Sequence, residues 1–381
     1  MDKKRRTQKT CAFFFGFKSL ATLLIVAGVV SCETPTSKVD PSSLVKKIDN
    51  SKERLTPFEA SLELLTYDGE SRQPTLAQDG KSIYFVGFNR QLHSEAQIYH
   101  FILDSKTEKR VTYNDGENLF PTLSYDQKEL AYISTTDSIK ENPNFDQLVG
   151  SKLQTKAITF SDHYTLNEDH FEVYTSDTNG RNIRRMTNRK GAEIFPQYIG
   201  KRDSDLVWFR TQTNQVEPRL PNSYLPSSRS LGSEKFRLLQ FRMNPYADVK
   251  ASVVELNGDT VLVAQFPDGK RTAQSQLTGF TSIHSFSIEN INGEAIVLLS
   301  AKANEKSNYD IFAWSPKSNS QQTIQLTNHS ADDWEPQMSS DGKNLIFSSF
   351  RTGSNQIYLI RWPNDMLQHS DLKAHLQDLA N

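Results

Sequence analysis

A 25-residue pattern occurs twice in this chain, at 110–134 (RVTYNDGENLFPTLSYDQKELAYIS) and at 325–349 (QLTNHSADDWEPQMSSDGKNLIFSS). Both copies have a Thr at the third place, a Pro at the twelfth, an acidic turn near the seventeenth and an apolar run from the twenty-first. Self-similarity of this kind is typical of proteins built from repeated supersecondary units. The repeat therefore restricts the fold to an array of similar units.

Partial copies of the pattern extend it over most of the chain. The recurring residues are Thr66, Thr112, Thr187, Thr278 and Thr327, followed by Pro74, Pro121, Pro196 and Pro336 after all but the fourth. Short apolar runs separated by turn residues predict strands, and Asp79-Gly80 or Asp341-Gly342 favours a tight hairpin. We expect four strands per unit, with strand A starting at the Pro, where no ladder N–H is needed, and strand D ending at the Thr.

The spacing of the threonines predicts the architecture. The steps from one Thr to the next are 46, 75, 91 and 49 residues, and periods near 46 with four strands indicate a β-propeller. The 75-residue step fits one blade with an insertion within 136–169, and the 91-residue step fits two blades, with Lys235–Gln240 as a strand D. We therefore expect an all-β propeller of six blades, with five as the alternative. The last unit lacks a strand D, which Ser61–Thr66 would supply to close the ring.

The recurring P-x-x-x-x-D-G-K-x-I/L-x-F sequence with a preceding L-T resembles the WD40-like PD40 repeats of TolB-type β-propellers over about residues 61–362. The resemblance implies a propeller that binds other proteins, although some similar propellers are lyases or cyclases. We do not expect the α/β domain that precedes the propeller of TolB, because only residues 33–60 lie between Cys32 and the first strand. No partner-binding residue of that family can be placed on this sequence.

The N-terminus predicts export and lipidation. A basic segment and an apolar stretch from Leu20 to Val30 are typical of a secretory signal peptide, and the stretch is too short to span a bilayer. The ending Val29-Val30-Ser31-Cys32 resembles a bacterial lipobox, which implies that Cys32 is lipidated; an ordinary signal with an incidental Cys is the alternative. Cys11 lies in the removed segment, so Cys32 would be the only mature cysteine.

These features predict the organisation of the whole chain. We expect a lipoprotein signal peptide at 1–31, a flexible tether at 32–58, the propeller at 59–365 and a short C-terminal helix at 366–381. Removal of 1–31 takes six Lys/Arg and one Asp from totals of 44 and 45, which leaves a formal charge of −6. Nucleic acid binding requires clustered Lys/Arg, so we expect no nucleic acid partner. The lipid anchor places the protein in a bacterial cell envelope, with the inner or outer membrane left open.

Acidic residues precede strand A in several units. They include Glu117, Glu193, Asp332 and Asp333, the last beside Trp334. If strand A is innermost, these residues surround the mouth of the axial channel, where carboxylates could bind a cation or a basic peptide. The alternative is that they bond to local backbone N–H groups as turn formers.

Two segments exceed what the repeat requires, at 136–169 and 211–233. Long loops on a rigid scaffold often carry binding, and Tyr224 and Leu225 are candidate contacts; a passive loop is the alternative. No catalytic motif occurs, so we expect no cofactor apart from a channel-bound cation. The sequence thus predicts a non-catalytic envelope lipoprotein that binds a protein or peptide. The alternative is a propeller enzyme, of lyase or hydrolase type, acting on glycan or peptide.

Overall fold

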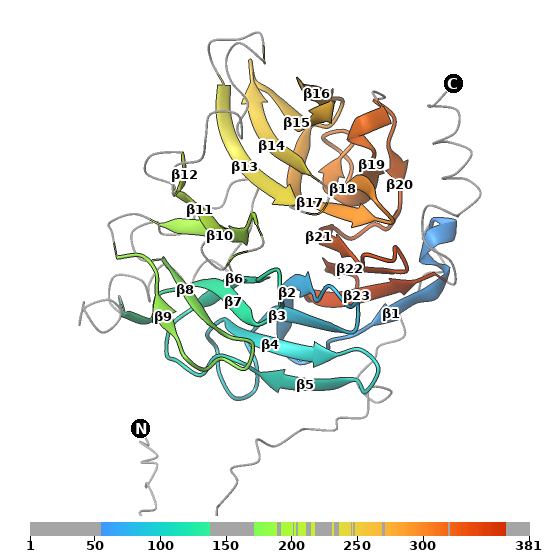
Figure 1. Cartoon of the computed structure of the whole chain (residues 1–381). Coiled ribbons are helices and arrows are strands. Elements are labelled where there is room, and N and C mark those ends of the chain that lie inside the picture. Colours follow the sequence, from blue (N-terminus) through green and yellow to red (C-terminus); the bar gives the residue numbers. More distant parts are fainter. Residues whose placement is uncertain are drawn as a thin grey trace, which may run out of the picture. The chain divides into compact units, whose positions relative to one another are not determined.

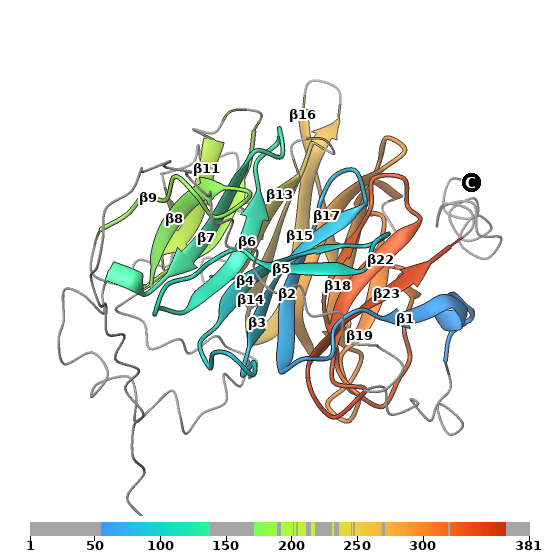
Figure 2. The same ribbon diagram turned by 90° about the horizontal axis from the view of Figure 1, so that it is seen from below.

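The computed structural model describes residues 55–137, 171–188, 192–200, 202, 205–210, 215–217, 231, 236–244, 246, 248–268, 271–318 and 321–362. All of them belong to one compact unit, Thr36–Asn381. Their strands form six antiparallel sheets that follow one another around a common centre (Figures 1 and 2). The predicted six-bladed propeller is therefore confirmed.

The blades follow the order of the chain. Blade 1 contains β2 (Glu70–Leu76), β3 (Ser82–Phe88), β4 (Gln97–Ile102) and β5 (Thr107–Arg110). Blade 2 contains β6 (Asn118–Leu123), β7 (Glu129–Ser134), β8 (Glu172–Asp177) and β9 (Arg184–Arg185), and blade 3 contains β10 (Glu193–Tyr198), β11 (Leu206–Arg210) and β12 (Gln215–Glu217). Blade 4 contains β13 (Phe236–Asn244), β14 (Val249–Leu256), β15 (Asp259–Asp268) and β16 (Arg271–Leu277). Blade 5 contains β17 (Ser282–Ile291), β18 (Glu294–Lys302), β19 (Asp310–Trp314) and β20 (Ile324–Gln325), and blade 6 contains β21 (Asp333–Met338), β22 (Asn344–Ser349), β23 (Gln356–Arg361) and β1 (Leu62–Leu64).

Blade 6 takes its outer strand from the N-terminal side of the chain, as the sequence predicts. β1 pairs antiparallel with β23, with Leu62 opposite Ile360 and Leu64 opposite Tyr358. A short 3-10 helix, η2 (Pro57–Ser61), precedes β1, and a second, η5 (Pro316–Ser318), follows β19. The ring is thus closed by segments from opposite ends of the propeller.

The strand assignment at Lys235–Gln240 is wrong. Phe236–Asn244 is β13, the innermost strand of blade 4, and it pairs with β14 from Phe236 opposite Leu256 to Asn244 opposite Val249. An apolar run at the outer or inner edge of a blade looks the same in sequence. The structure shows that this run is an inner strand, because Leu238 and Phe241 are buried between this blade and the neighbouring β10.

The middle strands of the blades are buried on both faces, as their uninterrupted apolarity predicts. β3, β7 and β22 each carry at least four consecutive buried residues. Large side chains fill the spaces between blades: Phe85 of blade 1 packs in one cluster with Ile346 of blade 6, and Tyr132 of blade 2 packs with Tyr84 of blade 1. Burial of such side chains contributes about 1.5–3 kcal/mol each.

The repeated prolines do not start strand A as predicted; they lie inside it at a β-bulge. The residue before each Pro has a left-handed backbone: Gln73 (φ 51°), Phe120 (φ 53°), Phe195 (φ 53°) and Glu335 (φ 56°). The register with strand B shifts at each of these sites, for example between Arg72 and Thr75. A bulge leaves an unpaired residue in the ladder, and Pro has no N–H to leave without a partner. The Pro therefore marks a bend in the innermost strand.

The predicted acidic turns are confirmed as A–B hairpin turns. The carboxylates of Asp79, Asp126 and Asp341 each accept a hydrogen bond from the backbone N–H two residues later, at 3.0, 3.1 and 3.1 Å. The intervening residue is left-handed whether it is Gly80 (φ 66°) or Gln127 (φ 60°). The Asp side chain thus stabilises the turn even in the copy that lacks Gly.

The repeated threonines have a structural reason. Their hydroxyl oxygens accept hydrogen bonds from backbone N–H groups of strand C: Thr66 from Ile357 (2.9 Å), Thr112 from Ile98 (2.9 Å), Thr187 from Val173 (2.9 Å) and Thr327 from Ile311 (3.0 Å). All four threonines are buried. The side chain therefore continues the ladder where strand D ends.

Replacing Thr327 with valine tests this role. We expect the free energy of unfolding to fall by about 1–3 kcal/mol, because the buried Ile311 N–H loses its acceptor while the shape of the side chain is kept. Urea unfolding measures the change. Thr278→Val is the control, since Thr278 is exposed and a surface substitution should change stability by at most about 0.5 kcal/mol. An equal loss in both variants would contradict the proposed role.

Candidate functional site: the axial channel

Within the part of the chain that the structure describes, the innermost strand of every blade has one edge without a ladder partner. β2, β6, β10, β13, β17 and β21 each pair only with strand B of their own blade, and they surround the centre of the ring (Figure 1). Backbone groups on such an edge need other partners when they are shielded from water. Side chains of neighbouring blades supply several of them.

These contacts between blades occur at two levels along the channel. The first level lies at the bulge and comprises Gln73 Oε1 with Phe120 N (2.7 Å), Glu335 Oε2 with Gln73 N (2.6 Å) and Ser285 Oγ with Glu335 N (2.9 Å). The second level lies closer to the A–B turns and comprises Gln197 Oε1 with Met243 N (3.0 Å), Gln337 Oε1 with Leu76 N (2.8 Å) and Glu289 Oε1 with Met338 N (3.3 Å). At the second level, two acceptors are amides and one is a carboxylate.

A cavity of about 360 Å³ lies among the six inner strands. Every blade contributes residues to its wall, and it extends to the A–B turns, where Gln78, Tyr125, Gly200 and Ser340 line it. A volume of this size falls within the range of small-ligand sites. The axial channel is therefore a pocket that one side chain or a short segment could enter from the A–B turns.

The wall of the cavity combines apolar and polar side chains. It includes Pro74, Pro121, Pro196, Pro336, Phe120, Phe195, Met243 and Met338. At the A–B turns the rings of Tyr125 and Tyr246 stack at 4.3 Å, and the Tyr246 hydroxyl donates to Gln78 Oε1 at 3.1 Å. Burial raises the pKa of Tyr246, so its hydroxyl stays a donor. Because these three residues come from blades 2, 4 and 1, Tyr246 bridges blades that are not neighbours.

Among the described residues, the charged side chains that line the cavity are Arg242, Glu289 and Glu335. Burial raises the pKa of the Glu335 carboxyl, and the positive charges of Arg72 and Arg242 oppose this rise. Glu335 Oε2 also accepts from the Ser348 hydroxyl at 2.7 Å. The charge of Glu335 is thus offset by two guanidinium groups.

Glu289 has a different environment. Burial raises the pKa of its carboxyl to about 7, and hydrogen bonds from the Ser287 hydroxyl and the Met338 N–H oppose the rise. The Ser287 bond is 2.7 Å long and ends on the same oxygen, Oε1, as the Met338 bond. No cation among the described residues contributes to this shift. Glu289 is therefore the carboxyl of the cavity whose charge is least offset.

Two of the residues predicted at the channel mouth cap a neighbouring blade. Glu117 Oε2 accepts from Ala96 N at 2.6 Å, and Asp332 Oδ1 accepts from Tyr309 N at 2.9 Å. Both acceptors precede strand A, and both donors precede strand C of the preceding blade. Burial raises the pKa of Glu117. These carboxylates occupy equivalent positions and hold the B–C loop of one blade against the next.

The other predicted mouth residues lie at the same end of strand A. Glu193 and Asp333 are fully buried, and Asp333 N donates to Tyr309 O at 2.8 Å. The ring of Trp334 stacks on His284 at 5.4 Å, and the Arg72 guanidinium lies 4.7 Å from its centre. None of the five predicted residues is among those that line the cavity. Whether they bind a partner or a cation stays a prediction.

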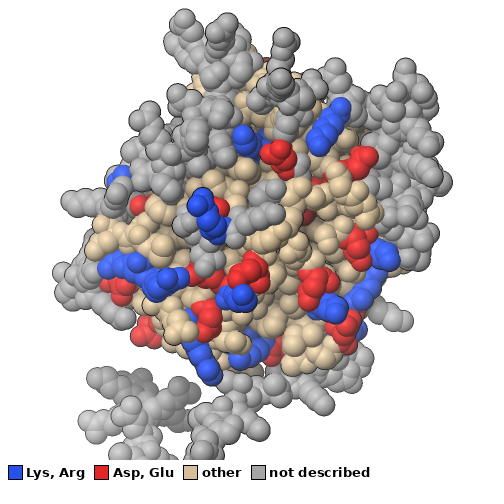
Figure 3. Space-filling model, viewed as in Figure 1, with Lys and Arg blue, Asp and Glu red and all other residues tan. Residues whose placement is uncertain are grey.

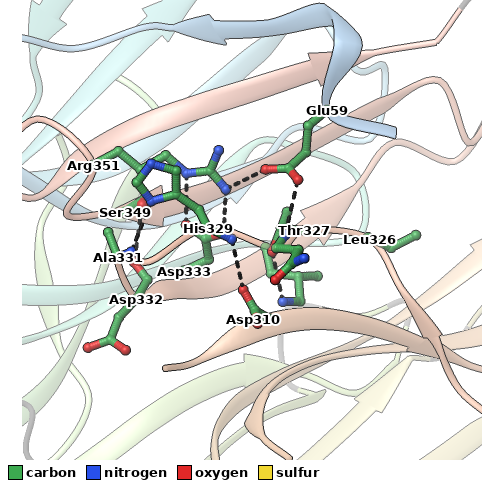
Figure 4. A network of polar contacts seen from close by, with 12 residues as sticks. Glu59, Asp310, Leu326, Thr327, His329, Ala331, Asp332, Asp333, Ser349 and Arg351 are labelled. Carbon is green, nitrogen blue, oxygen red and sulfur yellow. Dashed lines mark hydrogen bonds and ion pairs between the residues drawn. The ribbon is translucent and has the colours of Figure 1, made fainter. Parts of the chain in front are cut away.

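Asp333 belongs to a buried ion cluster. The Arg351 guanidinium contacts both Asp333 oxygens, at 2.5 and 3.1 Å, and Glu59 at 2.7 Å. The side chains of all three residues are shielded from solvent. Figure 4 shows Arg351 between the two carboxylates, with Asp310 nearby. Glu59 lies in η2, so the cluster joins the segment that closes the ring to blade 6.

Several predictions fall outside the described residues: lipidation at Cys32, the contacts Tyr224 and Leu225, and the helix at 366–381. Within the part of the chain that the structure describes, no group of three or more His, Cys, Asp or Glu side chains could hold a metal ion. In that same part, no helix is both long and apolar enough to cross a membrane. On the face seen in Figure 3, the described basic and acidic residues intermingle.

Sequence reasoning missed the polar residues of the cavity, Arg242, Tyr246 and Glu289. One signal was available: Gln197 and Gln337 directly follow repeated prolines. Side chains at that place point to the neighbouring blade, and Glu289 makes the equivalent bond in a blade that has no such Pro. Without the Pro, the register of Glu289 is not visible in the sequence.

No protein-family model and no curated protein matches the chain. Similar solved structures include an oligogalacturonate lyase from Vibrio parahaemolyticus, with 14% identity, a TM-score of 0.49 and coverage of 78% of this chain and 80% of that chain. TolB from Acinetobacter baumannii has 14% identity, a TM-score of 0.34 and coverage of 79% and 56%. A putative TolB from Agrobacterium tumefaciens has 12% identity, a TM-score of 0.40 and coverage of 78% of this chain and 92% of that chain. TolB-type propellers are thus among the structures similar to this chain; such low identities say nothing of its activity, and the fold assignment rests on the strand order of the six sheets.

Proposed function

We propose that this chain is a lipid-anchored protein of the bacterial cell envelope whose propeller binds a protein or peptide without catalysis. The observation that carries this proposal is the cavity among the six inner strands, whose wall combines apolar and polar side chains and which ends at the A–B turns. A concave site of this volume, in which polar groups converge beside apolar side chains, is a candidate ligand site. A rigid ring with a narrow axial pocket suits an inserted side chain or an extended segment of a partner.

The sequence supports the proposed localisation in the cell envelope. The apolar stretch before Cys32 and the lipobox-like ending imply export and acylation. A single acyl chain gives weak membrane binding, so stable anchoring requires more than one chain or a second signal. The segment 33–54, rich in Ser, Pro and charged residues, would then separate the propeller from the membrane surface.

Site-specific photocrosslinking in membranes of the native host tests the binding face. We expect a crosslinker at Ser340 to capture an envelope protein, because Ser340 is exposed and lines the cavity at the A–B turns. The matched control is Leu92, which is 86% exposed in the β3–β4 loop at the other end of the blades. Adducts are compared by mass spectrometry. Capture at Leu92 but not at Ser340 would contradict a partner on the A–B face.

One observation favours a second candidate, the propeller enzyme acting on glycan or peptide. A carboxyl with a pKa of about 7 in a cavity, as at Glu289, is suited to general acid–base catalysis. Release of products from envelope glycans or peptides, lost in Glu289→Gln, would support this candidate over the binding function.

A further inference from the structure

Glu289 presents a carboxylate oxygen to the cavity without a partner. The residue lies on β17 and lines the cavity at the second level of contacts between blades. Both of its hydrogen bonds, from Ser287 and Met338, end on Oε1. Oε2 has no hydrogen-bond partner among the described residues, and this oxygen is not fully buried. The second oxygen therefore remains available to a ligand.

The structural role of Glu289 does not require a charge. Gln197 and Gln337 make the equivalent contact with an amide oxygen, at 3.0 and 2.8 Å. The Glu289 contact is longer, at 3.3 Å, so the carboxylate is not a better acceptor for this N–H. Glu289 is partly buried, and an ionised carboxylate in such a site without a counter-ion is unfavourable. A ligand cation would remove this disadvantage.

The other charges of the cavity do not supply that counter-ion. The charged residues on its wall among those described are Arg242, Glu289 and Glu335. Arg242 and Arg72 act on Glu335, and no cation among the residues that the structure describes acts on Glu289. The two described guanidinium groups near the cavity thus act on Glu335 and not on Glu289.

We propose that the cavity binds an organic cation of a peptide, a lysine ammonium or an arginine guanidinium, with Glu289 as its counter-ion. The inference rests on the proposed peptide-binding function and names the group that enters. Proline, phenylalanine and methionine side chains on the wall fit the alkyl part of such a side chain. A hydrated inorganic cation would instead need several oxygen ligands.

Calorimetric titration of the full mature chain at pH 8 tests the inference. The probes are a blocked pentapeptide with a central lysine between glycines and the same peptide with norleucine. We expect the lysine peptide to bind at least roughly tenfold more tightly, since charge pairing adds to the same apolar contact. Glu289→Gln should abolish this difference. Glu294→Gln is the matched control, because Glu294 is exposed on the same hairpin and should leave the difference unchanged.

Equal binding of the two peptides, no binding of either, or a preference for lysine that survives in Glu289→Gln would overturn the inference. Thermal unfolding of both variants confirms that they fold. The crosslinking at Ser340 separates this outcome from the proposed function. A partner captured equally by wild type and Glu289→Gln leaves peptide binding intact and refutes the cation site. Selective lysine binding with no captured partner supports the cation site and contradicts the proposed binding of an envelope protein.

Discussion

Replacing Arg351 with methionine is expected to lower the free energy of unfolding by about 3–5 kcal/mol, because it leaves two buried carboxylates without a counter-ion. Arg351 contacts Asp333 at 2.5 Å and Glu59 at 2.7 Å, and none of the three side chains reaches solvent. Asp310 lies near this cluster, and burial and the charge of Asp333 raise its pKa to about 7. Urea unfolding at pH 7 measures the loss.

Two further variants make this test specific. Arg361→Met removes an exposed arginine that lies 4.0 Å from Glu63, and such pairs contribute at most about 1 kcal/mol. Adding Glu59→Gln and Asp333→Asn to Arg351→Met should recover part of the loss, because no uncompensated charge remains. If the triple variant is as unstable as Arg351→Met alone, the loss comes from packing of the arginine and not from charge.

The position of this cluster explains why it is expected to matter to the whole ring. Glu59 also accepts from Asn328 N at 3.0 Å, so η2 is held by blade 5 as well as by blade 6. Thr56 and Glu59 form a capping box at the start of η2. A weakened cluster would release β1, the strand that closes the propeller. The edge of β23 that pairs with β1 would then be exposed.

The repeat predicted the fold because its residues are scaffold residues. Asp341 and Thr327 make turn and ladder bonds that recur from blade to blade, so sequence spacing reports them directly. The bulge was not predictable in the same way. The left-handed position before the Pro is Gln73, Phe120, Phe195 or Glu335, and these share no side-chain property. Only the pairing with strand B reveals it.

The candidate site was harder to predict than the fold. Spacing placed Glu117 and Asp332 correctly before strand A, yet their carboxylates bond to the preceding blade, at the opposite end of strand A from the A–B turns that the cavity reaches. The direction of a side chain at a strand end depends on the neighbouring loop, which sequence spacing does not encode. Glu289 gave no signal because what distinguishes it is that no described cation contributes to its pKa, a property of the assembled ring.

Glu289→Gln is expected to stabilise the protein at pH 8 by about 1–3 kcal/mol and to leave its stability nearly unchanged at pH 4. Burial raises the pKa of Glu289 from 4.5 to about 7, so the folded state binds this proton more tightly than the unfolded state. The stability contributed by the protonated carboxyl is present below pH 4.5 and is lost as the pH rises to 7. Glutamine stays neutral throughout and keeps the acceptor for Met338 N–H.

Urea unfolding of wild type, Glu289→Gln and Glu294→Gln at both pH values measures this effect. The exposed Glu294 should give no pH-dependent difference. A Glu289→Gln variant that is no more stable than wild type at pH 8 would show that solvent or a protein cation already compensates the carboxylate.

The same experiment connects stability with binding. A ligand that binds only the folded state stabilises it by mass action, and a cation beside Glu289 would also lower the pKa of this carboxyl. The lysine peptide should therefore raise the stability of wild type at pH 8 and have little effect on Glu289→Gln. Natural proteins commonly retain destabilising groups at binding sites, where stability and function compete. An unfavourable charge in the channel is consistent with such a site, because only a bound cation would turn it into a favourable contact.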